Sequence, residues 1–177
     1  MIFRIAFLAT FALVATSART DSTPWQIQES TDPITDETSY YVFSTGSKVG
    51  DNIMHYAPDL VVRVTPKDLM PTGEMKYKPE IMLQLGDFDA VDRHGCELTM
   101  RYDKRKPIVE TWIPSTDRHA MFAPDDMETL KRLKVSTNLT ARFTTTLGYV
   151  RTSTFNVGGL TNALKQVKTR FESRHKQ

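Results

Sequence analysis

Cysteine is nearly absent from the sequence, since Cys96 is the only one among 177 residues. A chain with one thiol forms no internal disulfide, so its stability must come from core packing even in an oxidising compartment. Within the segment 96–102 the thiol alternates in phase with Leu98 and Met100, a pattern that predicts a buried and inert side chain. A reactive or intermolecular thiol is the alternative.

The sequence also lacks a strong charge of one sign, because 23 Lys+Arg stand against 21 Asp+Glu and are spread along the chain. This argues against nucleic acid as the main partner, which would favour a basic stripe. Outside the amino terminus, no apolar run approaches the roughly 20 residues that a membrane-spanning helix requires. With 40% hydrophobic and 25% charged residues, the composition is that of a globular domain with a real core.

Motifs for catalysis and for metal binding are missing as well. The four histidines are isolated from one another in the sequence: His55, His94, His119 and His175. None forms an HExxH-type spacing, and no serine lies in a Gly-x-Ser-x-Gly elbow. We therefore predict no enzyme activity, no cofactor and no metal. A hydrolytic triad that uses His119, near Asp117, with some serine remains the alternative.

One loop, 86–95, gathers carboxylates and an imidazole between two predicted strands. Its candidate oxygen and nitrogen ligands are Asp87, Asp89, Asp92 and His94. The spacing does not follow the calcium-loop pattern, and no Glu closes it. We predict a solvated hairpin loop of turn-forming residues, and leave open whether the segment from Asp87 to His94 binds a cation.

The first eighteen residues read as a secretory signal peptide. Arg4 supplies the positive charge, Ile5 to Val14 form a short apolar run, and small residues end at Ala18. We expect cleavage near Ala18, a polar leader over 19–24, and a soluble mature chain in the periplasm or secreted, without stable membrane insertion. An uncleaved anchor is the alternative.

The rest of the chain predicts a mainly β fold, an antiparallel β-sandwich or partly open barrel, as one domain over 25–171 with a tail at 172–177. Eight strands are expected at 25–28, 40–44, 60–64, 81–85, 96–102, 108–112, 139–143 and 149–155. A short helix is expected over 124–133, with Pro124 at its first position. A closing amphipathic helix follows Gly159, and its apolar stripe consists of Leu160, Ala163, Leu164, Val167 and Phe171.

A candidate binding site comes from Arg101-x-Asp103 and from Trp112-x-x-Ser115-x-Asp117. The alternation of the strand places Arg101 and Asp103 on the face opposite the core. An exposed arginine with a tryptophan nearby is typical of an anchor for a protein partner. The alternative is a cross-strand pair in which the indole packs against the sheet.

These segments give the chain a resemblance to the VasI-type family of exported proteins associated with type VI secretion and phage-like gene sets. The matching elements, in order, are Trp25, 34–38, 60–63, 101–103, 112–117, Phe122, 139–143 and 155–160. The family pattern places two cysteines where this sequence has Val64 and the segment 168–171, so the disulfide it implies is missing here. The resemblance implies an accessory or binding protein in the periplasm and no catalytic residues.

We therefore expect an exported protein that binds another protein of the cell envelope or of a secretion system. The oligomeric state and the identity of the partner stay open. A small hydrolase acting on envelope material, or an inhibitor of such a hydrolase, is the alternative from a different class. An enzyme would show a cleft with convergent polar groups, whereas a binding module would show an exposed anchoring patch.

Overall fold

The structure, a computed structural model, describes residues 23–49, 57–69, 75–85 and 90–174. The predicted signal peptide at 1–18 and its cleavage site lie outside the described residues, as does the segment 86–89 of the acidic loop. The first described residues, Thr23 and Pro24, lead directly into Trp25. Its indole Nε1 donates a hydrogen bond to the Val157 carbonyl oxygen at 3.2 Å, so the start of the domain is tied to its last third.

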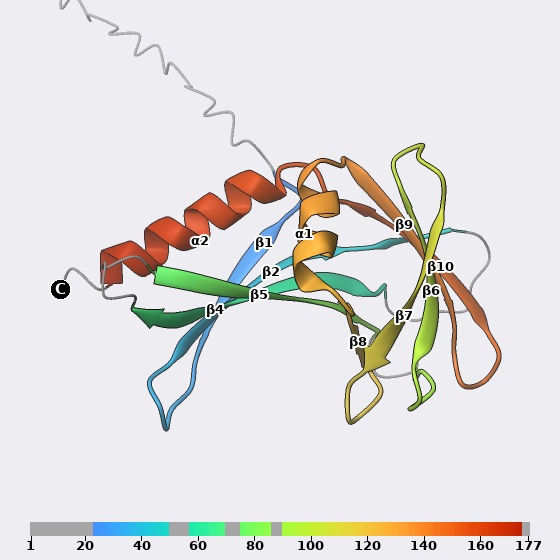
Figure 1. Ribbon diagram of the computed structural model, residues 1–177, viewed down its shortest axis with the longest axis horizontal. Coiled ribbons are helices and arrows are strands. Elements are labelled where there is room, and N and C mark those ends of the chain that lie inside the picture. Colours follow the sequence, from blue (N-terminus) through green and yellow to red (C-terminus); the bar gives the residue numbers. More distant parts are fainter. Residues whose placement is uncertain (1–22, 50–56, 70–74, 86–89, 175–177) are drawn as a thin grey trace, which may run out of the picture.

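The described part of the chain is mainly β, with ten strands and two helices. The strands are β1 (Gln26–Thr31), β2 (Thr38–Thr45), β3 (Ser47–Lys48), β4 (Asp59–Leu69), β5 (Met75–Gln84), β6 (Cys96–Tyr102), β7 (Ile108–Pro114), β8 (Ala120–Phe122), β9 (Asn138–Thr144) and β10 (Val150–Asn156). The helices are α1 (Asp126–Lys134) and α2 (Leu160–Arg174). Figure 1 shows their arrangement.

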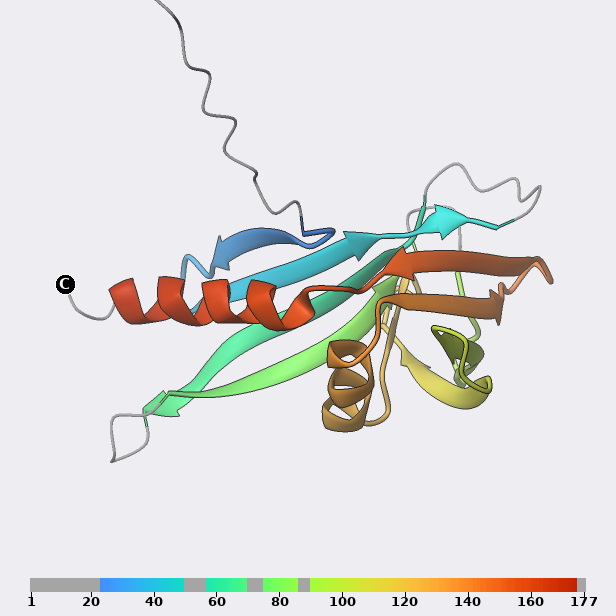
Figure 2. The same ribbon diagram turned by 90° about the horizontal axis from the view of Figure 1, so that it is seen from above.

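All strand pairs are antiparallel, and the strands follow the order β1-β2-β4-β5-β8-β7-β6-β9-β10-β3. The sheet bends at β7, where residues 108–112 pair with β6 whereas Ile113 and Pro114 pair with β8. It therefore forms two halves that lie at an angle and enclose a core, as Figure 2 shows. The sheet is not closed into a barrel, which agrees with the sandwich-like fold expected from the sequence.

The two halves of the sheet are joined at Gly46, between β2 and the end strand β3. This single residue separates β2, which pairs with β4, from β3, which pairs with β10. A Cβ atom at position 46 would lie 2.7 Å from Cε1 of the buried Phe155 ring, so the close approach of the chain to this ring requires glycine. The chain thus crosses from one half of the sheet to the other within one residue.

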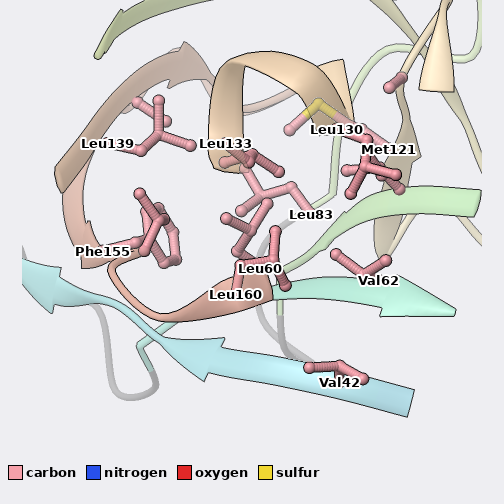
Figure 3. Packing of buried hydrophobic residues seen from close by; sticks show 14 of the residues in the cluster. Val42, Leu60, Val62, Leu83, Met121, Leu130, Leu133, Leu139, Phe155 and Leu160 are labelled. Carbon is pink, nitrogen blue, oxygen red and sulfur yellow. The ribbon is translucent and has the colours of Figure 1, made fainter. Parts of the chain in front are cut away.

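One hydrophobic core lies between the two halves and under the helices. Leu60 and Leu83 of one half face Leu130 and Leu133 of α1, and Phe155 of the other half lies near the start of α2 (Figure 3). Cys96 belongs to the same cluster, and its burial raises the pKa of the thiol. The prediction of a buried cysteine is therefore confirmed.

Helix α1 begins two residues later than expected, at Asp126. Pro124 precedes the helix, and Asp125 is the N-cap, with its side chain accepting a hydrogen bond from the Glu128 amide at 2.9 Å. The next residue, Asp126, accepts the backbone N–H of Ile81 at 2.7 Å. These two carboxylates start the helix and attach it to β5.

Helix α2 lies along β1 and β2 on the core side of the sheet (Figures 1 and 2). Its apolar stripe is buried at Leu160, Ala163, Val167 and Phe171. The Phe171 ring meets the Tyr40 ring edge-on, with centroids 4.5 Å apart and planes at 75°. The expectation that the closing helix covers a face of the sheet is confirmed, with the difference that Leu164 is only partly buried.

Candidate binding surface

The residues of the predicted site occupy different places in the fold. Arg101 is exposed on β6, as the alternation of that strand predicts. Asp103 follows in the turn between β6 and β7 and has a positive φ of 52°. Its Oδ1 accepts the backbone N–H groups of Thr137 and Asn138, both at 2.9 Å, and these hydrogen bonds hold its pKa below the usual value. Asp103 therefore joins the β6–β7 turn to the start of β9.

Trp112 is not an exposed anchor. Its side chain is only 1% exposed and belongs to the core, where the indole Nε1 donates to Oε2 of Glu110 at 3.3 Å. The residue alternates with Ile113, which points to solvent, so the strand has one aromatic side chain inside and one aliphatic side chain outside. The alternative interpretation, an indole packed against the sheet, describes its position.

Ser115 and Asp117 build the tight turn between β7 and β8. The Ser115 hydroxyl donates to Oδ1 of Asp117 at 2.5 Å and accepts the Ala120 amide at 3.0 Å. Asp117 also accepts the His119 amide at 3.1 Å, and the Ser115 hydroxyl, followed by this amide, lowers its pKa. Both polar side chains, Ser115 and Asp117, therefore stabilise the turn through local hydrogen bonds.

The five predicted residues do not form one site. The turn with Asp103 and the turn with Ser115 and Asp117 lie at opposite ends of β7, a strand of seven residues. At about 3.4 Å per residue the two turns are roughly 20 Å apart. Sequence proximity suggested a cluster, but an extended strand between two turns separates the polar residues that flank it.

The acidic loop is described only from Ala90 onward. There, Asp92 Oδ1 accepts the His94 amide at 2.8 Å, and Arg93 Nε donates to His94 Nε2 at 3.1 Å. Among the residues that the structure describes, no group of three or more His, Cys, Asp or Glu side chains is placed to hold a metal ion. Since Asp87 and Asp89 lie outside those residues, the question of a cation in this loop stays open.

A different surface appears on the outer face of the sheet. Five apolar side chains from five adjacent strands stand directly opposite one another, in the order Phe43, Val61, Met82, Phe122 and Ile113. We call this set the apolar row. At about 4.8 Å between strands it is roughly 19 Å long.

The apolar row faces away from the core. Val61, the second residue of the row, is 4% exposed yet does not belong to the core cluster, whereas its chain neighbours Leu60 and Val62 do. At the end of the row Ile113 is 59% exposed. The solvent face of an antiparallel sheet is usually polar, so a continuous apolar row on it is the kind of patch that marks an interaction site.

Polar residues flank the apolar row on both sides. One neighbouring line is formed by Tyr41, Arg63 and Glu80, which stand opposite one another, and Arg63 and Glu80 form an ion pair. The line on the other side contains Thr45 and Asp59, joined by a hydrogen bond of 2.6 Å. An open hollow of about 410 Å³ spans the row near Phe43 and Val61. An apolar centre with a polar rim is the usual anatomy of a protein interface.

The apolar row was missed in the sequence because only strand register creates it. Phe43 and Val61 are 18 positions apart, and each apolar residue of the row sits in a strand whose opposite face is also apolar. The continuous apolar run 60–62 could have indicated it. A strand with one face in water should alternate apolar and polar residues, and this run does not. Such a run predicts apolar side chains on both faces of β4.

Comparison of the chain with models of protein families, with curated proteins and with solved structures found no match. Within the described residues, neither helix is long and apolar enough to cross a membrane. The likeness to VasI-type proteins therefore stays a prediction from short segments.

Proposed function

We propose that this chain is an exported, non-catalytic binding protein that recognises a protein component of the cell envelope through the apolar row. The observation that carries the proposal is the row itself, five apolar side chains in register across five strands of the outer face. Its partner is a protein surface with an apolar ridge and hydrogen-bonding groups at the rim, which would meet Asp59 on one side and the Arg63–Glu80 pair on the other.

The envelope location in this proposal rests on the sequence. Arg4, the apolar run 5–14 and the small residues up to Ala18 favour export with cleavage near Ala18. Type VI secretion enters only through the VasI-type likeness. Intact-mass measurement of the exported protein tests the first point, and a retained amino terminus would contradict cleavage.

The binding surface can be tested by site-specific crosslinking from two matched positions. Ile113 and Val109 lie on the same face of β7 and are 59% and 60% exposed. Ile113 ends the apolar row, whereas Val109 stands opposite Thr99 and outside the row. A photoreactive amino acid at position 113 should yield a discrete adduct with an envelope protein in the living cell, and the same group at position 109 should not.

The identity and specificity of that adduct decide the proposal. Adding Asp59→Lys, at the rim, should weaken the adduct from position 113, and mass spectrometry should identify one envelope protein. A secretion-system component would support the finer assignment. Equal adducts from positions 113 and 109, or none from 113, would overturn the apolar row as the binding surface. An adduct consisting of two copies of this chain would replace the envelope partner with self-association.

A further inference from the structure

On the opposite side of the sheet, a cleft lies between residues of α1, α2 and the strands β4 and β5. Its volume is about 260 Å³. Its apolar walls come from the sheet and from both helices: Val64, Pro79, Met127, Leu130, Leu164 and Val167. This cleft is separate from the apolar row, which lies on the outer face.

The cleft explains why Leu164 is not fully buried. Leu160, Ala163, Val167 and Phe171 on the same stripe of α2 are buried against the core. Leu164 is partly buried because part of its side chain lines the cleft instead of packing against a neighbour. Met127, 64% exposed on α1, lies at the same cleft. A flexible thioether at an apolar hollow is well suited to close over a ligand.

Among the side chains that the structure describes, Lys134 is the only charged one that lines the cleft. Lys131 of the same helix pairs with Glu128 at 3.8 Å, and Lys168 of α2 pairs with Glu172 at 3.7 Å. Lys134 forms no ion pair with any residue of the described ranges. An apolar hollow lined by an unpaired ammonium is complementary to an apolar chain that ends in an anion.

We propose that the α1–α2 cleft binds a free medium-chain fatty acid, with the hydrocarbon chain between the helices and the carboxylate on Nζ of Lys134. The size of the cleft limits the ligand that it can hold. A cleft of about 260 Å³ lies near the small end of the range for ligand sites and favours a chain of medium length over a long one.

Octanoate and 1-octanol test the apolar and the anionic parts separately, because they share a chain and differ in charge. Titration of the purified mature protein should show saturable binding of both, with octanoate bound about fivefold more tightly. Lys134→Gln should remove that difference and leave octanol binding unchanged. Lys168→Gln, on an exposed and already paired lysine of α2, is the matched control and should preserve it.

The site is located on the unmodified protein by methyl NMR, so the result does not depend on a variant that folds poorly. Octanoate should shift the methyl signals of Val64, Leu130, Leu164 and Val167 and leave Leu139 of β9 unchanged. Absence of saturable shifts, or shifts spread evenly over the protein, would overturn the site. Equal binding of octanoate and octanol would overturn the role of Lys134. Ile113→Lys should leave octanoate binding intact, which separates this result from the envelope-binding proposal.

Discussion

Arg132 on α1 and Glu110 on β7 form an ion pair on the core side of the sheet, with Nη1 and Oε1 2.5 Å apart. Glu110 also accepts the Trp112 indole N–H, and Arg132 also contacts Glu128 at 3.2 Å. Both side chains of the pair are mostly shielded from solvent. This network attaches the short helix to the strand at which the sheet bends.

Removing the acid should destabilise the fold because Arg132 and the Trp112 indole would each lose a partner. We expect Glu110→Ala to lower the free energy of unfolding by about 1–2 kcal/mol in urea titration. Glu172→Ala, which breaks an exposed pair on α2, should change it by less than about 0.5 kcal/mol. A double-mutant cycle with Arg132→Ala measures the coupling, and a value near zero would contradict a stabilising ion pair.

Tyr102 should make stability fall in alkaline solution. Burial, followed by the charge of Glu110, raises the pKa of its phenol to about 12. In the unfolded chain this pKa is about 10, so the folded state holds the proton more tightly. The contribution of the protonated Tyr102 phenol to the free energy of unfolding is fully present below pH 10. It is lost as pH rises through the folded pKa of about 12, and the total loss is on the order of 2–3 kcal/mol. In urea titrations, the free energy of unfolding of Tyr102→Phe should fall less between neutral and alkaline pH than that of the wild type. Identical pH profiles for the two proteins would contradict the role of Tyr102.

Asp103 should stabilise the β6–β7 turn chiefly through its ionised oxygen. The backbone N–H groups of Asn138 and Thr137 lower its pKa, so its contribution is present above the unfolded pKa and is lost as pH falls through the lower, folded pKa. Asp103→Asn keeps an acceptor and tolerates the positive φ, whereas Asp103→Ala does neither. At neutral pH, the melting temperature should be highest for the wild type, lower for Asp103→Asn and lowest for Asp103→Ala. Equal melting temperatures for the two variants would refute this role.

Phe171 should be the most costly residue of α2 to truncate. It is buried and meets the Tyr40 ring, so Phe171→Ala removes packing and leaves a cavity, at a cost of about 3–5 kcal/mol. Leu164→Ala should cost on the order of 1 kcal/mol, because this side chain already borders a cleft. Urea titration compares the two variants directly. Similar losses would mean that Leu164 packs as fully as the rest of the stripe.

Much of the fold follows from local patterns. Alternation in 96–102 and 139–143 correctly predicted which side chains enter the core, and Gly148, with a φ of +80°, makes the turn of the predicted β9–β10 hairpin. The strands β3 and β8 were not predicted. They have two and three residues, too few for any periodicity to be visible.

The candidate site was harder to predict because it depends on pairing between distant segments. Trp112 was proposed as part of an anchor with the exposed Arg101, with packing of the indole against the sheet as the alternative, and its side chain lies in the core. The core-facing position of Glu110 could have been predicted from the sequence, because the residue alternates with Ile108 and Trp112 on the same face of β7. A carboxylate on a core-facing position predicts a buried basic partner, although the sequence does not say that α1 supplies it.

The one-residue step at Gly46 also governs how the molecule can come apart. Gly46 donates to the Pro58 carbonyl at 2.8 Å, while Ser44 and Ser47 on either side donate to backbone oxygens of β10 at 2.9 and 3.1 Å. The continuous segment 44–47 therefore forms hydrogen bonds with both halves of the sheet, and no loop separates the two sets of bonds. Local unfolding of one half would break hydrogen bonds that also hold the other half. We therefore expect the domain to unfold in a single cooperative transition.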